Sequence, residues 1–153
     1  MVGAILKGGK EYAVLEDCTI KGSPRLWGDT VVAAHDRHHA VDVVVESNHG
    51  GNLAKHVIEE AARRAHHIGK RDHATIRVRM ETASKGKVMR AHAVSLLYEK
   101  GAVYHRPGLQ SLESELLCFS DDWDRGRDGS PNHLDAAVWA LERLRGIKRV
   151  IMV

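Results

Sequence analysis

Two carboxylates, Glu46 and Asp135, occupy positions at which proteins often bind a divalent metal ion. Glu46 ends an apolar run, VDVVVE, and is followed at once by the segment SNHGG; Asp135 lies in SPNHLDAA, at the start of the last helical pattern. Two carboxylates a few ångströms apart would repel each other, and one would stay protonated unless a cation lay between them. Carboxylate oxygens are the ligands that Mg²⁺ prefers in proteins. We therefore expect both residues to bind metal, brought together by the fold.

The surroundings of Glu46 indicate how it is positioned. The run 41–46 is rich in valine, which is typical of a strand buried on both faces. A parallel strand that ends in a carboxylate delivers that group to the carboxyl edge of the sheet, where ligand sites lie in α/β folds. Gly50 and Gly51 then allow a sharp turn and a close approach of phosphate to the next helix.

Strand patterns alternate with helical patterns along the rest of the chain. A hairpin is expected over 2–18, with a two-residue turn at Gly8-Gly9, and Ser23-Pro24 has the residue types of a helix start. This order predicts an α/β domain with a mixed sheet flanked by helices. After strand 41–46 we expect a helix over 52–65 buried through Leu53, His56, Val57 and Ala61, a strand over 75–80, a helix from Ser84 to 98, a strand over 102–105, and helices over 109–119 and 131–145.

Composition places the chain among ordinary globular proteins. Its 153 residues are 43% hydrophobic and carry a formal net charge of +3, which predicts one domain, 1–153, and permits a phosphate-rich partner. Neither a secretory leader nor a membrane span is expected. The chain has only two cysteines, Cys18 and Cys118, and they are far apart in the sequence. We therefore expect reduced thiols in a cytosolic protein and no disulfide framework.

Basic residues gather in the middle of the chain. They flank the two acidic positions as a group, which favours a rim that faces DNA, although each one alone is typical of a solvated helix or loop end. The group comprises Arg63, Arg64, Lys70, Arg71, Lys85, Lys87 and Arg90.

Five short motifs occur in an order that resembles a known family. They are ESNHGG from Glu46, SKGKVMRA from Ser84, GAVYH from Gly101, LESEL from Leu112 and SPNHLDA from Ser130. In this order they resemble the C-terminal nuclease domain of the terminase large subunit of tailed bacteriophages, over residues 1–145, with 146–153 as a tail. The resemblance implies a ribonuclease H-like fold and a metal-dependent endonuclease that cleaves double-stranded DNA during genome packaging.

The resemblance also implies roles for individual residues. Glu46 and Asp135 match two of the three acids that hold two Mg²⁺ or Mn²⁺ ions in that family, which makes them the expected catalytic and metal-binding residues. The implied partners are DNA, the ATPase domain, the small terminase subunit and the portal, in the cytoplasm of a bacterial host and with no membrane. The residues expected to contact DNA are Lys85, Lys87, Arg90, Asn48 and His133.

The sequence departs from the family at its beginning. The first family aspartate lies on a strand that precedes the hairpin, and this sequence starts at Met1, after that strand; the glycine-rich phosphate loop of an ATPase domain is absent too. A sheet without its first, central strand is therefore expected. One hypothesis is that residues 149–153, from this chain or a partner chain, fill that slot; they carry no acid, so they would restore the fold and not the chemistry. Incomplete catalysis follows, and the alternative is a non-catalytic module derived from a terminase that binds metal, DNA or other packaging components.

Three further groups of residues have two interpretations each. Glu16 and Asp17 could supply a third acid, but the end of a hairpin strand favours surface exposure. Histidine pairs such as His35 and His38 could bind zinc, but the cysteines do not complete such a set, so solvated histidines are favoured. His133 is the exception, because it could contact a metal-bound water or a phosphate. The acidic segment 121–128 resembles a calcium loop in composition but lacks its glycine placement, so a mobile loop that borders the site is favoured.

Overall fold

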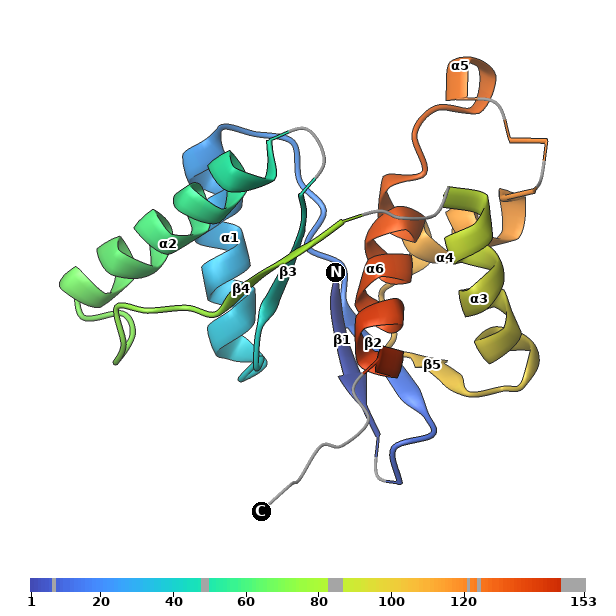
Figure 1. Cartoon of the computed structure of the whole chain (residues 1–153), viewed down its shortest axis with the longest axis horizontal. Coiled ribbons are helices and arrows are strands. Elements are labelled where there is room, and N and C mark those ends of the chain that lie inside the picture. Colours follow the sequence, from blue (N-terminus) through green and yellow to red (C-terminus); the bar gives the residue numbers. More distant parts are fainter. Residues whose placement is uncertain (7, 48–49, 83–86, 121, 124, 147–153) are drawn as a thin grey trace. The chain divides into compact units, whose positions relative to one another are not determined.

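The computed structural model describes residues 1–6, 8–47, 50–82, 87–120, 122–123 and 125–146. The chain is an α/β protein whose contacts gather in two compact units, where the sequence length had predicted one domain. The first unit comprises Met1–Thr19 and Lys85–Val153, and the second comprises Ile20–Ser84. The elements of both units are labelled in Figure 1.

The first unit contains a three-stranded mixed sheet. Strands β1 (Val2–Ile5) and β2 (Tyr12–Glu16) form the predicted antiparallel hairpin, and β2 pairs in parallel with β5 (Val103–His105). The expected two-residue turn is wrong, because the Leu6 amide donates to the Glu11 carbonyl oxygen at 2.8 Å and the connection is longer.

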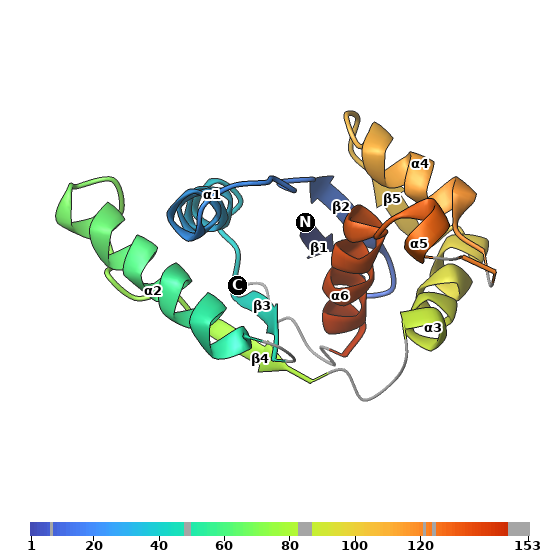
Figure 2. The ribbon, with the colours of Figure 1, turned by 90° about the horizontal axis from the view of Figure 1, so that it is seen from above.

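Helices pack against this sheet and form the larger core. Leu134, Ala137, Val138 and Leu141 are buried at the spacing of one helix face, which explains how the last helix docks. That helix, α6, lies between β1 and α3 in both views (Figures 1 and 2). The helices of this unit are α3 (Lys87–Glu99), α4 (Gln110–Cys118), the short α5 (Arg125–Asp128), which the sequence did not predict, and α6 (Asn132–Gly146).

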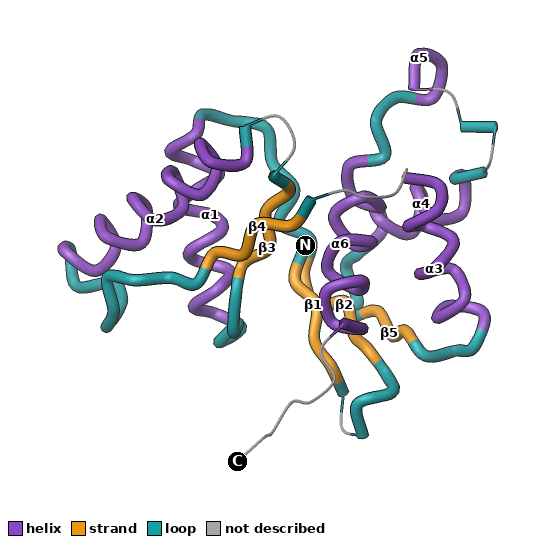
Figure 3. Tube along the Cα trace, viewed as in Figure 1, coloured by secondary structure: helices purple, strands orange, loops and turns teal. Residues whose placement is uncertain are grey.

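The second unit contains two helices and a two-stranded parallel sheet. Helix α1 (Pro24–Arg37) begins as predicted, with the Ser23 hydroxyl accepting a hydrogen bond from the Leu26 amide at 3.3 Å. Strand β3 (Val43–Glu46) pairs with β4 (Val78–Glu81), and α2 (Gly51–His67) connects them (Figure 3).

Two burial predictions for this unit are wrong in part. In α2 the buried side chains are Ile58, Ala61 and Ala62; Ala61 is buried as predicted and Val57 is half-buried, whereas Leu53 is 64% exposed and His56 is exposed as well. The buried face follows from the approach of α1, which Gly28 permits: a Cβ there would lie 2.9 Å from Val57 Cγ1. The valines of β3 are half-buried, since a sheet of two strands has only one face packed against the small core.

Several predicted features lie outside the described residues, namely the Ser84 helix cap and the strand formed by 149–153. Among the helices that the structure describes, none has the length and apolar character to cross a membrane.

Candidate functional site

The two predicted metal ligands belong to different compact units. Glu46 lies in the second unit and Asp135 in the first. The neighbours of each carboxylate are therefore described within its own unit. Within the described part of the chain, no three or more His, Cys, Asp or Glu side chains converge as metal ligands.

Glu46 ends β3 beside a second carboxylate that the sequence analysis did not single out. Its register partner is Glu81, the last residue of β4. Register partners on neighbouring parallel strands place their side chains on the same face of the sheet. The two strand ends are joined by a hydrogen bond from the Ser47 amide to the Glu81 carbonyl oxygen at 2.8 Å, and the hydroxyls of Ser47 and Thr82 are also 2.8 Å apart.

The turn after Glu46 needs glycine at both predicted positions. Gly50 has φ +104°, in the left-handed region that side chains rarely adopt. A Cβ on Gly51 would lie 2.7 Å from the Glu46 carbonyl oxygen and 2.6 Å from Met80 Cε. The absence of side chains thus lets the start of α2 press against the end of β3, and backbone amides with a positive dipole end lie close to this strand end.

Asp135 lies in the first turn of α6, as predicted, beside a buried arginine. Arg90 Nη2 is 3.4 Å from Asp135 Oδ1, and the Arg90 guanidinium lies 4.7 Å from the centre of the Trp139 ring. Arg90 is only 4% exposed. The guanidinium is therefore engaged inside the protein. Because it is buried, it is not exposed for the contact with DNA that the sequence analysis predicted.

His133 lies between two carboxylates, Asp17 and Glu115. Its Nδ1 contacts Asp17 Oδ2, and its Nε2 is 3.9 Å from Glu115 Oε1. Glu115 Oε2 in turn accepts a hydrogen bond from the Leu134 amide at 2.8 Å. The expectation that Asp17 is exposed is wrong, because its side chain keeps only 11% of its accessible surface.

The pKa of Asp17 is lowered below its usual value of 3.8. Burial alone would raise it, and hydrogen bonds from Thr19 and His133 outweigh that effect by stabilising the carboxylate. The Thr19 amide donates to Asp17 Oδ1 at 3.0 Å, which closes a local turn at the end of the hairpin. This turn was the available sequence signal: an Asp two residues before a Thr orders its own carboxylate.

The remaining residues predicted to contact DNA are only partly described. Asn48 and Lys85 lie outside the described residues. Lys87 begins α3, but the burial of its side chain is outside the described part too. Their contact with DNA stays a prediction.

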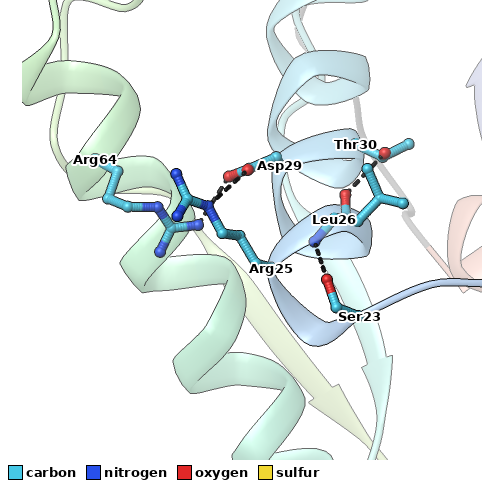
Figure 4. Close-up of polar contacts among 6 residues, drawn as sticks. All are labelled: Ser23, Arg25, Leu26, Asp29, Thr30 and Arg64. Carbon is cyan, nitrogen blue, oxygen red and sulfur yellow. Dashed lines mark hydrogen bonds and ion pairs between the residues drawn. The ribbon is translucent and has the colours of Figure 1, made fainter.

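The basic cluster in the second unit is largely engaged within the protein. Arg64 from α2 and Arg25 from α1 converge on Asp29, at 2.8 and 3.9 Å (Figure 4). Both arginines line a cavity of about 810 Å³. Arg63 pairs with Glu60 at 2.5 Å, and the side chain of Arg71, only 7% exposed, lies 3.3 Å from Asp36. Local ion pairing therefore explains these cations without a DNA partner.

Comparisons of the chain with models of known families, with curated proteins and with solved structures find no match. The geometry of these residues and the order of the motifs therefore carry the functional argument.

Proposed function

We propose that the chain is a metal-dependent endonuclease domain of the kind found in the large terminase subunit of tailed bacteriophages, with a ribonuclease H-like ancestry. Its substrate would be double-stranded DNA, held through phosphates without sequence preference, and its cofactor Mg²⁺ or Mn²⁺. Glu46 and Asp135 are the proposed catalytic metal ligands. The bound ion would lower the pKa of an attacking water and stabilise the charge that develops on the phosphate.

The observation that carries this proposal is the strand end at Glu46. Glu46 and Glu81 end neighbouring parallel strands in register, and both side chains are half-buried. Two carboxylates on one face form a set of hard oxygen ligands that suits Mg²⁺ or Mn²⁺. A Cβ added at Gly50 would have nothing within 4 Å, and the α2 N-terminus that begins beside it is a kind of site that suits a phosphate group.

The setting of Asp135 favours a second candidate function. An aspartate that is 3.4 Å from a buried guanidinium already has a cation to neutralise it, and a metal ion would compete with that arginine. A non-catalytic module derived from a terminase, which binds metal or DNA and contacts other packaging components, would keep the strand end at Glu46 and need no ionised Asp135 for chemistry.

Cleavage of supercoiled plasmid in Mn²⁺ distinguishes the two functions. The variants are Glu46→Gln, Glu81→Gln and Asp135→Asn, each tested by itself. The nuclease hypothesis expects cleavage by the wild type and its loss in Glu46→Gln and Asp135→Asn, because each removes a charged metal ligand. Glu81→Gln is expected to weaken cleavage in proportion to its share in binding the ion.

Glu59→Gln is the matched control. Glu59 lies on α2 of the same unit and is 3.9 Å from Lys55, one helical turn away, so its loss should leave cleavage unchanged. Equal cleavage by every variant would indicate a contaminating nuclease and reject the assignment. A folded wild type that binds DNA without cutting it would reject catalysis and favour the binding module.

A further inference from the structure

We infer that a cavity in the second unit binds a small organic phosphate, a ligand with an alkyl body and one phosphate group. The cavity has a volume of about 810 Å³, and its lining residues come from α1, from α2 and from the segment that follows α2. Small-molecule sites typically have volumes of about 300–1,000 Å³. Glu46, Glu81 and Asp135 do not line the cavity, so the inference is independent of DNA cleavage.

Apolar side chains supply part of the lining. Val32 and Ala61 belong to the buried core of the unit, whereas Ala33 and Ala65 are more exposed at the cavity. Ile68 also lines it and is 62% exposed, although it is a large hydrophobic residue. A ligand with an apolar body would remove this surface from water, which is favourable. Among the described residues that line the cavity, none is Phe, Tyr or Trp, so an alkyl body fits better than a ring that requires stacking.

The end of α2 places two cations beside one of these apolar positions. Gly69 has φ +69°, which lets the chain fold back where the helix ends. The Lys70 amide then donates to the Ala65 carbonyl oxygen at 2.8 Å, so the backbone of Lys70 lies beside the residue that follows Arg64. Arg64, Ala65 and Lys70 all line the cavity. An anionic group can therefore reach both cations while the rest of the ligand contacts apolar side chains.

Arg64 and Lys70 retain hydrogen-bond donors for such a group. Arg64 Nη2 donates to an oxygen of Asp29 at 2.8 Å, which orients the guanidinium (Figure 4). A guanidinium has five N–H donors, and the others on Arg64 make no hydrogen bond within the described part of the chain. The Lys70 ammonium likewise has no ion pair with a described residue. Guanidinium and ammonium groups are the usual protein ligands of phosphate.

The charge balance favours a doubly negative ligand. Three lysine and arginine side chains and two aspartates line the cavity. Asp29 is shared by Arg64 and Arg25, at 2.8 and 3.9 Å. Asp36 lies 3.3 Å from Arg71, a further cation that is only 7% exposed and whose Nε and Nη1 have no hydrogen-bond partner among the described residues. Two positive charges therefore remain in excess, which suits a phosphate group better than a carboxylate.

The test is titration of the purified chain with decyl phosphate, below its micelle concentration, followed by NMR spectra of the backbone amides. Saturable shifts are expected at Ala33, Ala65 and Ile68. Decanol and inorganic phosphate, each tested alone, should bind about 5-fold more weakly or worse, because each lacks one half of the interaction. Decanoate should also bind more weakly than decyl phosphate, because it carries a single negative charge.

Variants with matched controls locate the ligand. Arg64→Gln and Lys70→Gln should each weaken binding about 5-fold, because each removes one cation from the site. Arg63→Gln and Lys55→Gln remove the same residue types from positions on α2 that do not line the cavity, so binding should be unchanged. Ala33→Phe should abolish binding, because Ala33 is exposed at the cavity and a phenyl ring there would occupy the space.

Vesicles of phosphatidic acid distinguish the two sources of an alkyl phosphate. Vesicle binding that is lost in Arg64→Gln would assign the phosphate to a lipid headgroup, and binding of decyl phosphate without vesicle binding would assign it to a free molecule. Either result supports the site.

Four results would overturn the inference. The first is the absence of saturable shifts with decyl phosphate, and the second is a set of shifts that Ala33→Phe leaves intact. Equal affinity for inorganic phosphate would show a general anion-binding surface, and equal affinity for decanol would show an apolar surface alone. The titration contains neither DNA nor a metal ion, so its failure is distinct from a failure of the plasmid assay.

Discussion

Each compact unit contains an arginine–aspartate pair, and the two pairs differ both in the distance between their charged atoms and in their exposure to solvent. In the second unit Arg64 and Asp29 approach to 2.8 Å, but their side chains are 37% and 49% exposed. In the first unit Arg90 and Asp135 are farther apart, at 3.4 Å, and are only 5% and 20% exposed. The pair with the shorter distance is exposed to solvent, and the pair with the longer distance is largely buried.

Burial decides which pair matters for stability. Water screens exposed charges, and fixing two long side chains costs conformational entropy, so such pairs contribute little. Removing one partner of a buried pair leaves a charge without its solvent or its counterion. Arg90 also lies 4.7 Å from the Trp139 ring, which adds a cation–π contact to the same guanidinium. We therefore expect the Arg90–Asp135 pair to contribute more to the free energy of unfolding than the Arg64–Asp29 pair, although its charged atoms are farther apart.

Replacing Arg90 should have the largest effect. Arg90→Met keeps an unbranched apolar chain of similar length but leaves Asp135 without the guanidinium, and we expect a loss of about 3 kcal/mol in the free energy of unfolding. Urea denaturation followed by circular dichroism measures it. Arg90→Met combined with Asp135→Asn should recover part of that loss, because no uncompensated charge remains. A change below about 1 kcal/mol in Arg90→Met would show that burial does not control this pair.

A comparison of the predicted and observed helices and strands in both units shows which features sequence patterns can predict. The existence of α6 and the Ser23-Pro24 start of α1 were predictable because each depends on local spacing or on a side chain that bonds its own backbone. The buried face of α2 was not, because the contact at Gly28 depends on a partner helix far along the chain. The valine run of β3 gave a strand correctly but overestimated its burial, since hydrophobicity does not state how many strands surround it.

In the candidate site too, features set by neighbouring residues in the sequence were predictable, and features set by tertiary contacts were not. Glu46 and its glycine turn were predictable because the strand, the acid and the turn are adjacent in sequence. Glu81 was missed because only strand register makes it a neighbour of Glu46. Likewise, Asp17 and His133 are 116 residues apart and meet only in the fold. Residue type alone could not separate an exposed acid from one that orients a histidine.

The pair between Asp17 and His133 is intermediate in burial, at 11% and 25% exposed, and pH tests it. The folded pKa of Asp17 lies below 3.8, so its contribution to stability is complete above that value and is lost as the pH falls through the folded pKa. We expect Asp17→Asn to cost about 1 kcal/mol at neutral pH, because the amide forms weaker hydrogen bonds than the carboxylate.

Urea unfolding in EDTA at several pH values measures this difference without bound metal. The gap between the wild type and Asp17→Asn should narrow below pH 3.8, where the unfolded and then the folded wild type take up the proton. A gap that stays constant down to acid pH would mean that the charge of Asp17 contributes nothing and that only its shape matters.

Replacing Arg64 should have the smallest effect, although its pair is the shorter of the two. Arg64→Met removes one of two arginines that approach Asp29; the other, Arg25, remains 3.9 Å from it, and Asp29 is half solvated. We expect a loss below about 1 kcal/mol in the free energy of unfolding, measured by urea denaturation at low and high salt. The loss should shrink further in high salt because exposed charges are screened, whereas the loss in Arg90→Met should hardly respond. If Arg64→Met cost as much as Arg90→Met at both salt concentrations, distance rather than burial would rank the two pairs.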